Sequence, residues 1–244
     1  MGLLSWLNRP LSGFSQVSMA NENAFNPSPQ ARAILEKHSS LLKQATALKN
    51  AKRYDEAVGC LRAAYELANR HQIGKTAASL TRLPNYLALA GRVKEAWLEY
   101  NKVADMTYCY WYRSDQQTVA VIQADAYSRL AQMLRKNGYK AQASVFALVG
   151  YIVGRSAAKL NHDWCRKEGI KDIGRWNTHE GLEDALQDNT SHLPTEQQQL
   201  LRRMIVEELK GIPRIAPKVL ITKLYQALDC TDPAFGDQEG GTSA

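Results

Sequence analysis

The residue types best suited to hold a metal ion stand two-thirds of the way along the chain. His162 and Cys165 form an HxxC pair, and His179 with Glu180 follows at a distance. A structural zinc site usually takes four ligands from two closely spaced pairs, and the second pair is absent. We therefore expect no metal site, and we expect Cys165 to pack as a small hydrophobic residue beside Trp164.

Sequence motifs for nucleophilic or nucleotide chemistry are missing. The chain has no GxSxG elbow, no GxxxxGKS/T phosphate loop and no GxGxxG turn. No cysteine stands in a recognisable catalytic context, and the five histidines fall mostly in polar stretches. The sequence therefore predicts a protein that is not an enzyme and that uses no cofactor.

The distribution of charge indicates a binding surface. The chain has 244 residues and a net charge of +7. Residues 31–160 carry 20 Lys/Arg and 9 Asp/Glu, a net charge of +11, whereas residues 161–244 carry 10 and 14, a net charge of −4. This asymmetry predicts a basic surface on the middle of the protein, suited to an acidic protein segment or to a polyanion.

The basic region has the apolar spacing of helices, and it contains three segments that look like one another. The segments begin at His38, Ala77 and Ala124. Small residues recur at matching positions, where a larger side chain would force two helix axes apart. Glycines follow two of the first helices, where a helix ends in the left-handed conformation. These residues are Ala57, Ala96 and Ala143, with Gly91 and Gly138.

The three segments resemble the tetratricopeptide repeat (TPR), a helix–turn–helix unit of about 34 residues. The first match comprises Leu41, Ala45, Leu48 and the Tyr54-Asp55-Glu56-Ala57 turn, and the same pattern returns around Gly91 and Gly138. The resemblance implies an all-α fold, built as a right-handed array of helical hairpins with C-terminal capping helices. One departure is Pro84, which lies inside the first helix of the second unit and should kink or delay it.

Composition predicts four parts of the chain. Residues 1–30 form a flexible leader with a short apolar segment at its start, and residues 31–160 form the TPR-like array. Residues 161–230 form a helical cap, which begins with a loop or short helix from Asn161 to Trp176. Residues 231–244 are rich in Gly, Asp and Ser and are expected to be disordered.

The resemblance implies that residues of the first helix in each unit line the concave face of the array. Carried over by position, the polar and basic lining comprises Lys49, Asn50, Asn85, Gln132, Arg135 and Lys136, with Arg82 and Arg129 beside it. We expect these side chains to grip an acidic or polar segment of a partner protein through charge-assisted hydrogen bonds. The alternative is that the basic residues are a solvated face.

Tyr110 and Trp111 belong to an aromatic insertion between the second and third units. Three interpretations stay open for them: packing between repeats, a protein interface, and stacking on unpaired bases. The insertion has the sequence Tyr-Cys-Tyr-Trp-Tyr at positions 108–112. Five such residues in a row cannot all face inward on one helix, so we include Tyr110 and Trp111 in the predicted partner-binding set.

These observations together predict a non-enzymatic adaptor or scaffold that docks a partner protein. The alternative is a helical regulator that binds nucleic acid through the basic middle region.

The four cysteines are widely spaced, which favours reduced thiols and a cytoplasmic protein. The longest apolar run, Val145 to Val153, is too short to span a bilayer. Residues 1–14 are open to three interpretations: a membrane contact, a docking motif or a frayed end. The oligomeric state is not predicted.

Overall fold

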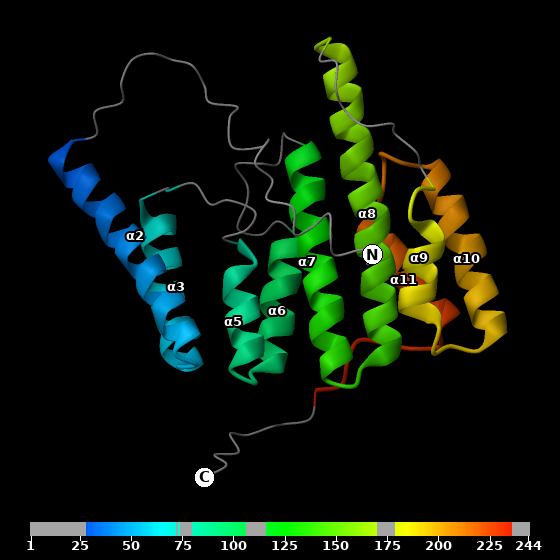
Figure 1. Ribbon diagram of the computed structural model, residues 1–244, viewed down its shortest axis with the longest axis horizontal. Coiled ribbons are helices and arrows are strands. Elements are labelled where there is room, and N and C mark those ends of the chain that lie inside the picture. Colours follow the sequence, from blue (N-terminus) through cyan, green and yellow to red (C-terminus); the bar gives the residue numbers. More distant parts are fainter. Residues whose placement is uncertain (1–27, 72, 74–79, 106–115, 170–178, 236–244) are drawn as a thin grey trace.

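The computed structural model describes residues 28–71, 73, 80–105, 116–169 and 179–235, and the regular secondary structure in these ranges is helical throughout. The all-α prediction is confirmed for this part of the chain. The helices follow one another across the molecule from α2 at one end to α10 at the other (Figure 1). They are α2 (Pro29–Asn50), α3 (Tyr54–Arg70), α5 (Arg82–Leu89), α6 (Val93–Ala104), α7 (Gln116–Lys136), α8 (Lys140–Lys167), α9 (Leu182–Thr190), α10 (Thr195–Lys210) and α11 (Pro217–Ala227).

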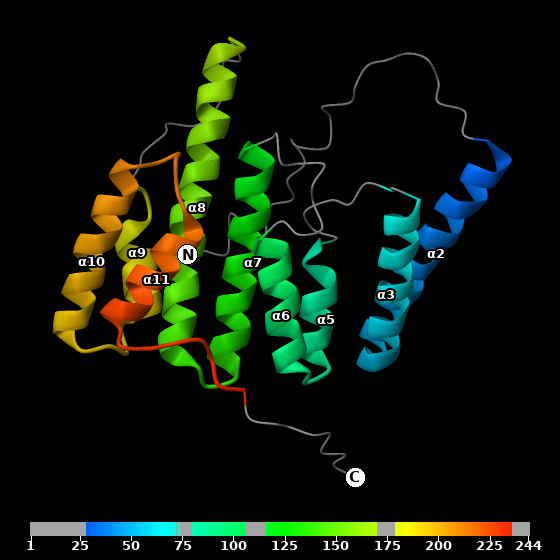
Figure 2. The same cartoon turned by 180° about the vertical axis from the view of Figure 1, so that it is seen from behind.

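Helices α2 to α8 form a series in which each helix packs against the next. The contacting pairs are α2 with α3, α3 with α5, α5 with α6, α6 with α7, and α7 with α8. Helices α9, α10 and α11 then pack against α8 and cover that end of the series, as the view from behind also shows (Figure 2). One continuous cluster of buried side chains therefore reaches from Ala45 in α2 to Leu224 in α11.

The three hairpins α2–α3, α5–α6 and α7–α8 close with the same turn. In each turn a backbone N–H donates to the carbonyl five residues earlier: Arg53 to Leu48 at 2.9 Å, Arg92 to Leu87 at 2.9 Å, and Tyr139 to Leu134 at 3.0 Å. The residue before each donor is left-handed: Lys52 with φ 59°, Gly91 with φ 75° and Gly138 with φ 86°. This is the Schellman ending of a helix. Lys52 adopts it in spite of its Cβ, at the position that glycine holds in the other two turns.

Small residues allow neighbouring helices to approach closely. Ala57, Ala96 and Ala143 are each fully buried, as the repeated pattern predicts. Gly150 on α8 has an even closer neighbour on α7. A Cβ at Gly150 would lie 2.9 Å from Oγ of Ser128 and 3.2 Å from its backbone nitrogen. Helices α7 and α8 can therefore pack at this distance only because residue 150 has no side chain.

Pro84 lies in the first turn of α5, which begins at Arg82. The first four N–H groups of a helix have no intrahelical partner, so a proline at this position removes no hydrogen bond. Leu80, before Thr81, is also helical, and residues 74–79 lie outside the described residues, so a kink or delay caused by Pro84 stays a prediction.

Two element boundaries differ from the sequence-based expectation. Helix α2 begins at Pro29, inside the predicted leader, because the Ser28 side chain caps it by accepting from the Ala31 N–H at 3.2 Å. Helix α8 runs through position 160, where the array was expected to end, as far as Lys167. The loop or short helix predicted from Asn161 is therefore the last part of a 28-residue helix. In Figure 1 this end of α8 projects beyond its neighbours.

The prediction of a disordered tail from residue 231 is wrong for residues 231–235. Pro233 is buried, and the Phe235 ring packs against Trp97 and Tyr139. Composition suggested disorder because these residues are mostly small or polar, but Pro233 and Phe235 together supply enough apolar surface to hold the segment on the array. The rest of the predicted tail, like residues 1–27, lies outside the described residues.

Helix α8 is long and apolar enough to cross a membrane by length and composition, although its longest uninterrupted apolar run is short. In this fold 72% of its most apolar window is buried inside the protein. It packs against α7, α9, α10 and α11, as a central core helix does.

Replacing Ala96 with Leu should overpack a helix crossing and lower the free energy of unfolding by about 1–3 kcal/mol. Leu98→Ala is the matched control on the same helix, because Leu98 is 51% exposed and its loss should change stability by less than about 0.5 kcal/mol. Urea unfolding followed by circular dichroism measures both. An Ala96→Leu variant as stable as the wild type would contradict close packing at this crossing.

Gly150→Ala should destabilise the protein by about 1–3 kcal/mol, because the new methyl group would collide with Ser128. Gly59→Ala makes the same change within α3, where nothing lies within 4 Å of the added Cβ. That control should stabilise the protein by roughly 0.5–1 kcal/mol, since alanine favours a helix interior over glycine. Equal shifts of the melting temperature in the two variants would rule out a special role for Gly150.

Candidate binding surface

The first helices of the three hairpins are more basic than the second helices of the first two hairpins. The first helices α2, α5 and α7 carry eight Lys/Arg and two Asp/Glu, a net charge of +6. The second helices α3 and α6 carry four Lys/Arg and five Asp/Glu, a net charge of −1. The basic character of the array therefore belongs chiefly to its first helices and to α8, which carries five Lys/Arg and one Asp.

The second helices neutralise their own charges. Arg62 on α3 pairs with Glu95 on α6 at 2.8 Å, and Arg92 beside α6 pairs with Asp55 on α3 at 3.4 Å. Arg92 also pairs with Glu95 at 2.5 Å, and these two acceptors raise the pKa of its guanidinium. Surface ion pairs thus link α3 and α6, and these two helices present little net charge to a ligand.

Arg82 joins α5 to α2. Its Nη2 donates to the Leu42 carbonyl at 3.1 Å and to Thr46 Oγ1 at 2.8 Å, and its guanidinium lies 5.8 Å from the centre of the Tyr86 ring. Among the described residues, its Nη1 and Nε make no hydrogen bond. Hydrogen bonds from Nη2 therefore hold the guanidinium in place, while its Nη1 and Nε groups remain able to donate hydrogen bonds to a ligand.

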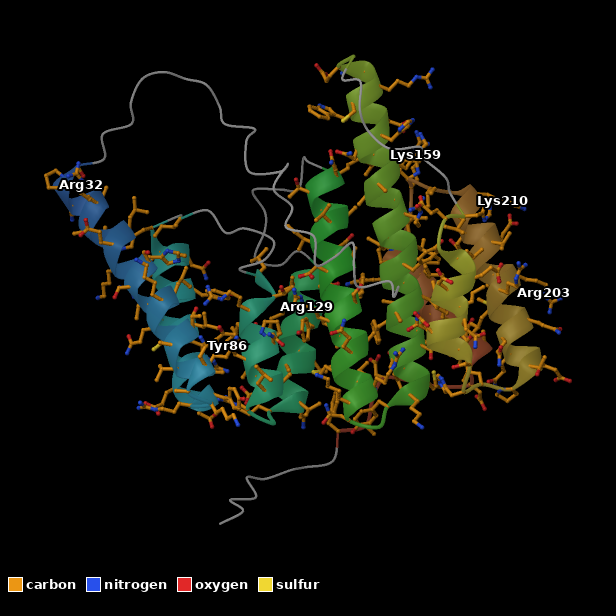
Figure 3. All side chains as sticks on the ribbon, viewed as in Figure 1. Arg32, Tyr86, Arg129, Lys159, Arg203 and Lys210 are labelled. Carbon is orange, nitrogen blue, oxygen red and sulfur yellow. The ribbon has the colours of Figure 1, made fainter. Side chains whose placement is uncertain are left out.

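Asp125 joins α7 to α5. Thr81 is 2% exposed, and its hydroxyl donates to Asp125 Oδ2 at 2.8 Å. Arg129 Nε donates to both oxygens of the same carboxylate, at 2.8 Å and 3.0 Å. Because Thr81 and Arg82 are adjacent, these contacts form one polar strip, and Figure 3 shows Tyr86 and Arg129 in the part of the array from α2 to α7. We call this strip (Leu42, Thr46, Thr81, Arg82, Asp125 and Arg129) the α2–α5–α7 face.

The other sequence-predicted residues lie on the same helices. Lys49 and Asn50 end α2, Asn85 is half-buried on α5, and Gln132 and Lys136 are exposed on α7. Within the described ranges, Lys49 and Lys136 have no ion-pair partner. Tyr110 and Trp111 lie outside the described residues.

Arg135 is turned towards the cap. Its Nη2 donates to Asn189 Oδ1 of α9 at 2.6 Å, whereas Arg82 and Arg129 meet at the α2–α5–α7 face. Partial desolvation, together with the charges of Lys140 and Arg135, lowers the pKa of His192 nearby. That imidazole is therefore neutral at neutral pH and adds no charge to this end of α7.

Sequence reasoning missed Thr81 as the residue that joins the two halves of the face. A threonine before an arginine carries no signal of its own, and its acceptor lies 44 residues further on. Asp125 likewise carries no local signal, because its partners Thr81 and Arg129 are identified only by their contacts. Its contacts show that it orients Arg129.

The residues considered for a metal site do not converge where the structure can be described. His162 and Cys165 lie near the end of α8, with Cys165 buried. Among the described residues no group of three or more His, Cys, Asp or Glu side chains is placed to hold a metal ion. Since residues 170–178 lie outside those ranges, the absence of a metal site stays a prediction.

In comparisons with known proteins, no family model, no curated protein and no solved structure matches this chain. The fold and the surface therefore define its class by themselves: an all-helical protein with three similarly closed hairpins and a basic polar face.

Thr81→Val should remove one buried hydrogen bond at nearly constant volume and lower stability by roughly 0.5–1.5 kcal/mol. Thr222→Val serves as the control, because its exposed hydroxyl bonds only to the Lys218 carbonyl one turn earlier in its own helix. Thermal unfolding compares the two. A Thr81→Val protein as stable as the Thr222→Val protein would show that the Thr81–Asp125 bond does not join α5 to α7.

Proposed function

We propose that this protein is a non-catalytic adaptor that docks an acidic or polar segment of a partner protein on the α2–α5–α7 face. The observation that carries the proposal is the separation of charge, +6 on the first helices against −1 on α3 and α6. An acidic segment gains from this excess, since charge complementarity raises the association rate and selects the docking orientation.

The two arginines of the face add specificity to this attraction. Arg82 is fixed by the α2 acceptors and Arg129 by Asp125, so neither side chain must be ordered when a ligand arrives. Preorganised donors lose less conformational entropy on binding than mobile ones do. A guanidinium also pairs with both oxygens of a carboxylate, which suits Asp and Glu side chains.

The hairpin series supports a TPR-like interpretation as part of this proposal. Three hairpins close with one type of turn and have buried alanines at matching positions. Repeats of this kind present their first helices as one extended surface, along which several units bind a single ligand. A right-handed superhelix, a cytoplasmic location and the lack of catalysis belong to the same proposal.

Nucleic acid is the second candidate ligand, because the same net charge attracts phosphates. The two ligands differ in the salt dependence of binding, which is steep when several phosphate counterions are released. The Arg129–Asp125 pair lowers the charge of the face towards either ligand, so the salt dependence and the choice of ligand must separate the two candidates.

A test of the α2–α5–α7 face must separate loss of binding from loss of folding. Arg82 and Arg135 hold neighbouring helices, so their reversal would disturb packing as well as binding. The better substitutions are Lys49→Gln and Lys136→Gln made together, at positions with no ion pair among the described residues. Lys167→Gln with Arg203→Gln removes the same charge from exposed positions on α8 and α10 that likewise have no ion pair among the described residues, and is the matched control.

Fluorescence anisotropy measures binding of a labelled twelve-residue Asp/Glu-rich peptide, its Asn/Gln counterpart and a single-stranded oligonucleotide. We expect the acidic peptide to bind best, and the Lys49/Lys136 variant to bind it about threefold to tenfold more weakly, at roughly 0.3–0.7 kcal/mol per exposed pair. The control variant should bind as the wild type does. Equal weakening in the two variants would refute the proposed face, and preferential, steeply salt-dependent oligonucleotide binding would favour the nucleic-acid alternative.

A further inference from the structure

The last described residues, 231–235, form an extended segment that lies against the array. After α11 the backbone turns at Asp229, with φ 49°, and continues as Thr231–Phe235, which we call the strap. Gln142 Nε2 donates to the Thr231 carbonyl at 3.1 Å, and the Tyr139 hydroxyl donates to the Ala234 carbonyl at 3.2 Å. Two side chains from the start of α8 therefore bind the main chain of the strap.

The strap is anchored by one aromatic ring. The centre of the Phe235 ring lies 5.2 Å from that of Tyr139, at an interplanar angle of 70°, and 5.8 Å from that of Trp97 on α6. Trp97 in turn meets Phe146 of α8 edge to face at 5.2 Å. Edge-to-face contacts at these distances are favourable for aromatic rings. We call the surface that contacts the strap, formed by Trp97, Tyr139 and Gln142, the aromatic groove; it belongs to α6, α8 and the turn before α8.

The strap and the aromatic groove contact each other as a bound peptide and its receptor do. The groove supplies both side-chain donors and the surrounding rings, whereas the strap supplies two carbonyl oxygens three residues apart, a buried proline and one aromatic ring. Main-chain hydrogen bonds combined with pockets for particular side chains are one way in which proteins recognise extended segments. A single turn at Asp229, with φ 49°, joins the strap to α11.

The strap fits its surroundings imperfectly where it begins. A hollow of about 600 Å³ remains between the strap and α11, lined by Lys218, Thr222, Tyr225, Asp229 and Asp232 among others. The Tyr225 hydroxyl is buried there, beside the Asp232 carboxylate, without a hydrogen bond of good geometry to any described residue. Burial, together with the Asp232 carboxylate, raises the pKa of this hydroxyl.

We propose that the aromatic groove is a second docking site. It takes an extended segment of a partner protein that has an aromatic residue and a proline two residues before it, as Pro233 stands before Phe235 in the strap. The strap occupies this site in the free protein and is displaced by the partner. The site lies on the second helices of the array, so the inference goes beyond the function proposed for the α2–α5–α7 face and does not depend on it.

The test uses the full chain and a fluorescein-labelled peptide with the sequence of residues 231–240. Phe235→Ala removes the ring that fills the groove, so this variant should bind the peptide at least tenfold more tightly than the wild type. The same peptide with its Phe replaced by Ala should lose at least tenfold in affinity. Equal binding of the peptide to wild type and variant, or binding that does not depend on the aromatic ring, would overturn the proposal.

Second substitutions in the Phe235→Ala background locate the site. Trp97→Ala should abolish peptide binding, and Leu98→Ala, at the exposed neighbouring position, should leave it unchanged. Retained binding after Trp97→Ala would place the peptide elsewhere and refute the groove.

If circular dichroism shows that Phe235→Ala does not fold, Phe235→Leu replaces it, and failure of both to fold would show that the strap is a fixed part of the core. Sedimentation of the wild type as a dimer through strap exchange would assign the groove to a second copy of the chain and overturn a partner protein as its occupant.

Discussion

The close approach of neighbouring helix axes is the constraint on which the rest of this structure depends. Ala57, Ala96 and Ala143 have no exposed surface, and at Gly150 even a methyl group would meet the backbone of α7. Packing forces act over short distances, so a helix pair separated by one larger side chain loses many contacts along its length. The small residues therefore decide that the hairpins stack as a series with one continuous core.

Stacking at this distance brings together polar residues that are far apart in the chain. Thr46 meets Arg82 across 36 residues, and Thr81 meets Asp125 across 44. On the first helices these contacts fix arginines whose charge is only partly neutralised. On the second helices the contacts pair opposite charges, as between Arg62 and Glu95. One packing arrangement thus produces a basic face on the first helices and nearly neutral surfaces on α3 and α6.

The two ends of the series differ in how they are covered. Helices α9 to α11 cover α8, whereas the first half of α2 is largely exposed, with Leu35 42% exposed. The strap then returns from the covered end to Trp97 on α6 and so ties the cap to the second hairpin. A ligand that displaced the strap would release this connection, which offers a physical route by which docking on the second helices changes the mobility of the cap.

Much of the fold follows from local sequence. Apolar spacing indicates the helices, Gly91 and Gly138 mark two helix ends, and the recurring alanines mark the crossings, because these features depend on backbone geometry within a few residues. Combined with the repeat resemblance, the same local spacing placed Lys49, Arg82, Arg129 and Lys136 on first helices. It failed at the end of α8, where charged residues continue the helix past position 160.

What only the tertiary structure decided is which side chains meet. No pattern within a few residues of Thr81 indicates that Asp125 accepts its hydrogen bond, or that Arg135 turns to Asn189 in the cap. Composition made residues 231–235 look like a disordered tail, although one proline and one phenylalanine hold them against the array. These outcomes depend on contacts between distant segments, whose free energy appears only after the helices have packed. The sequence alone therefore determines the helices and the sign of the charge, and the packed fold determines the binding geometry.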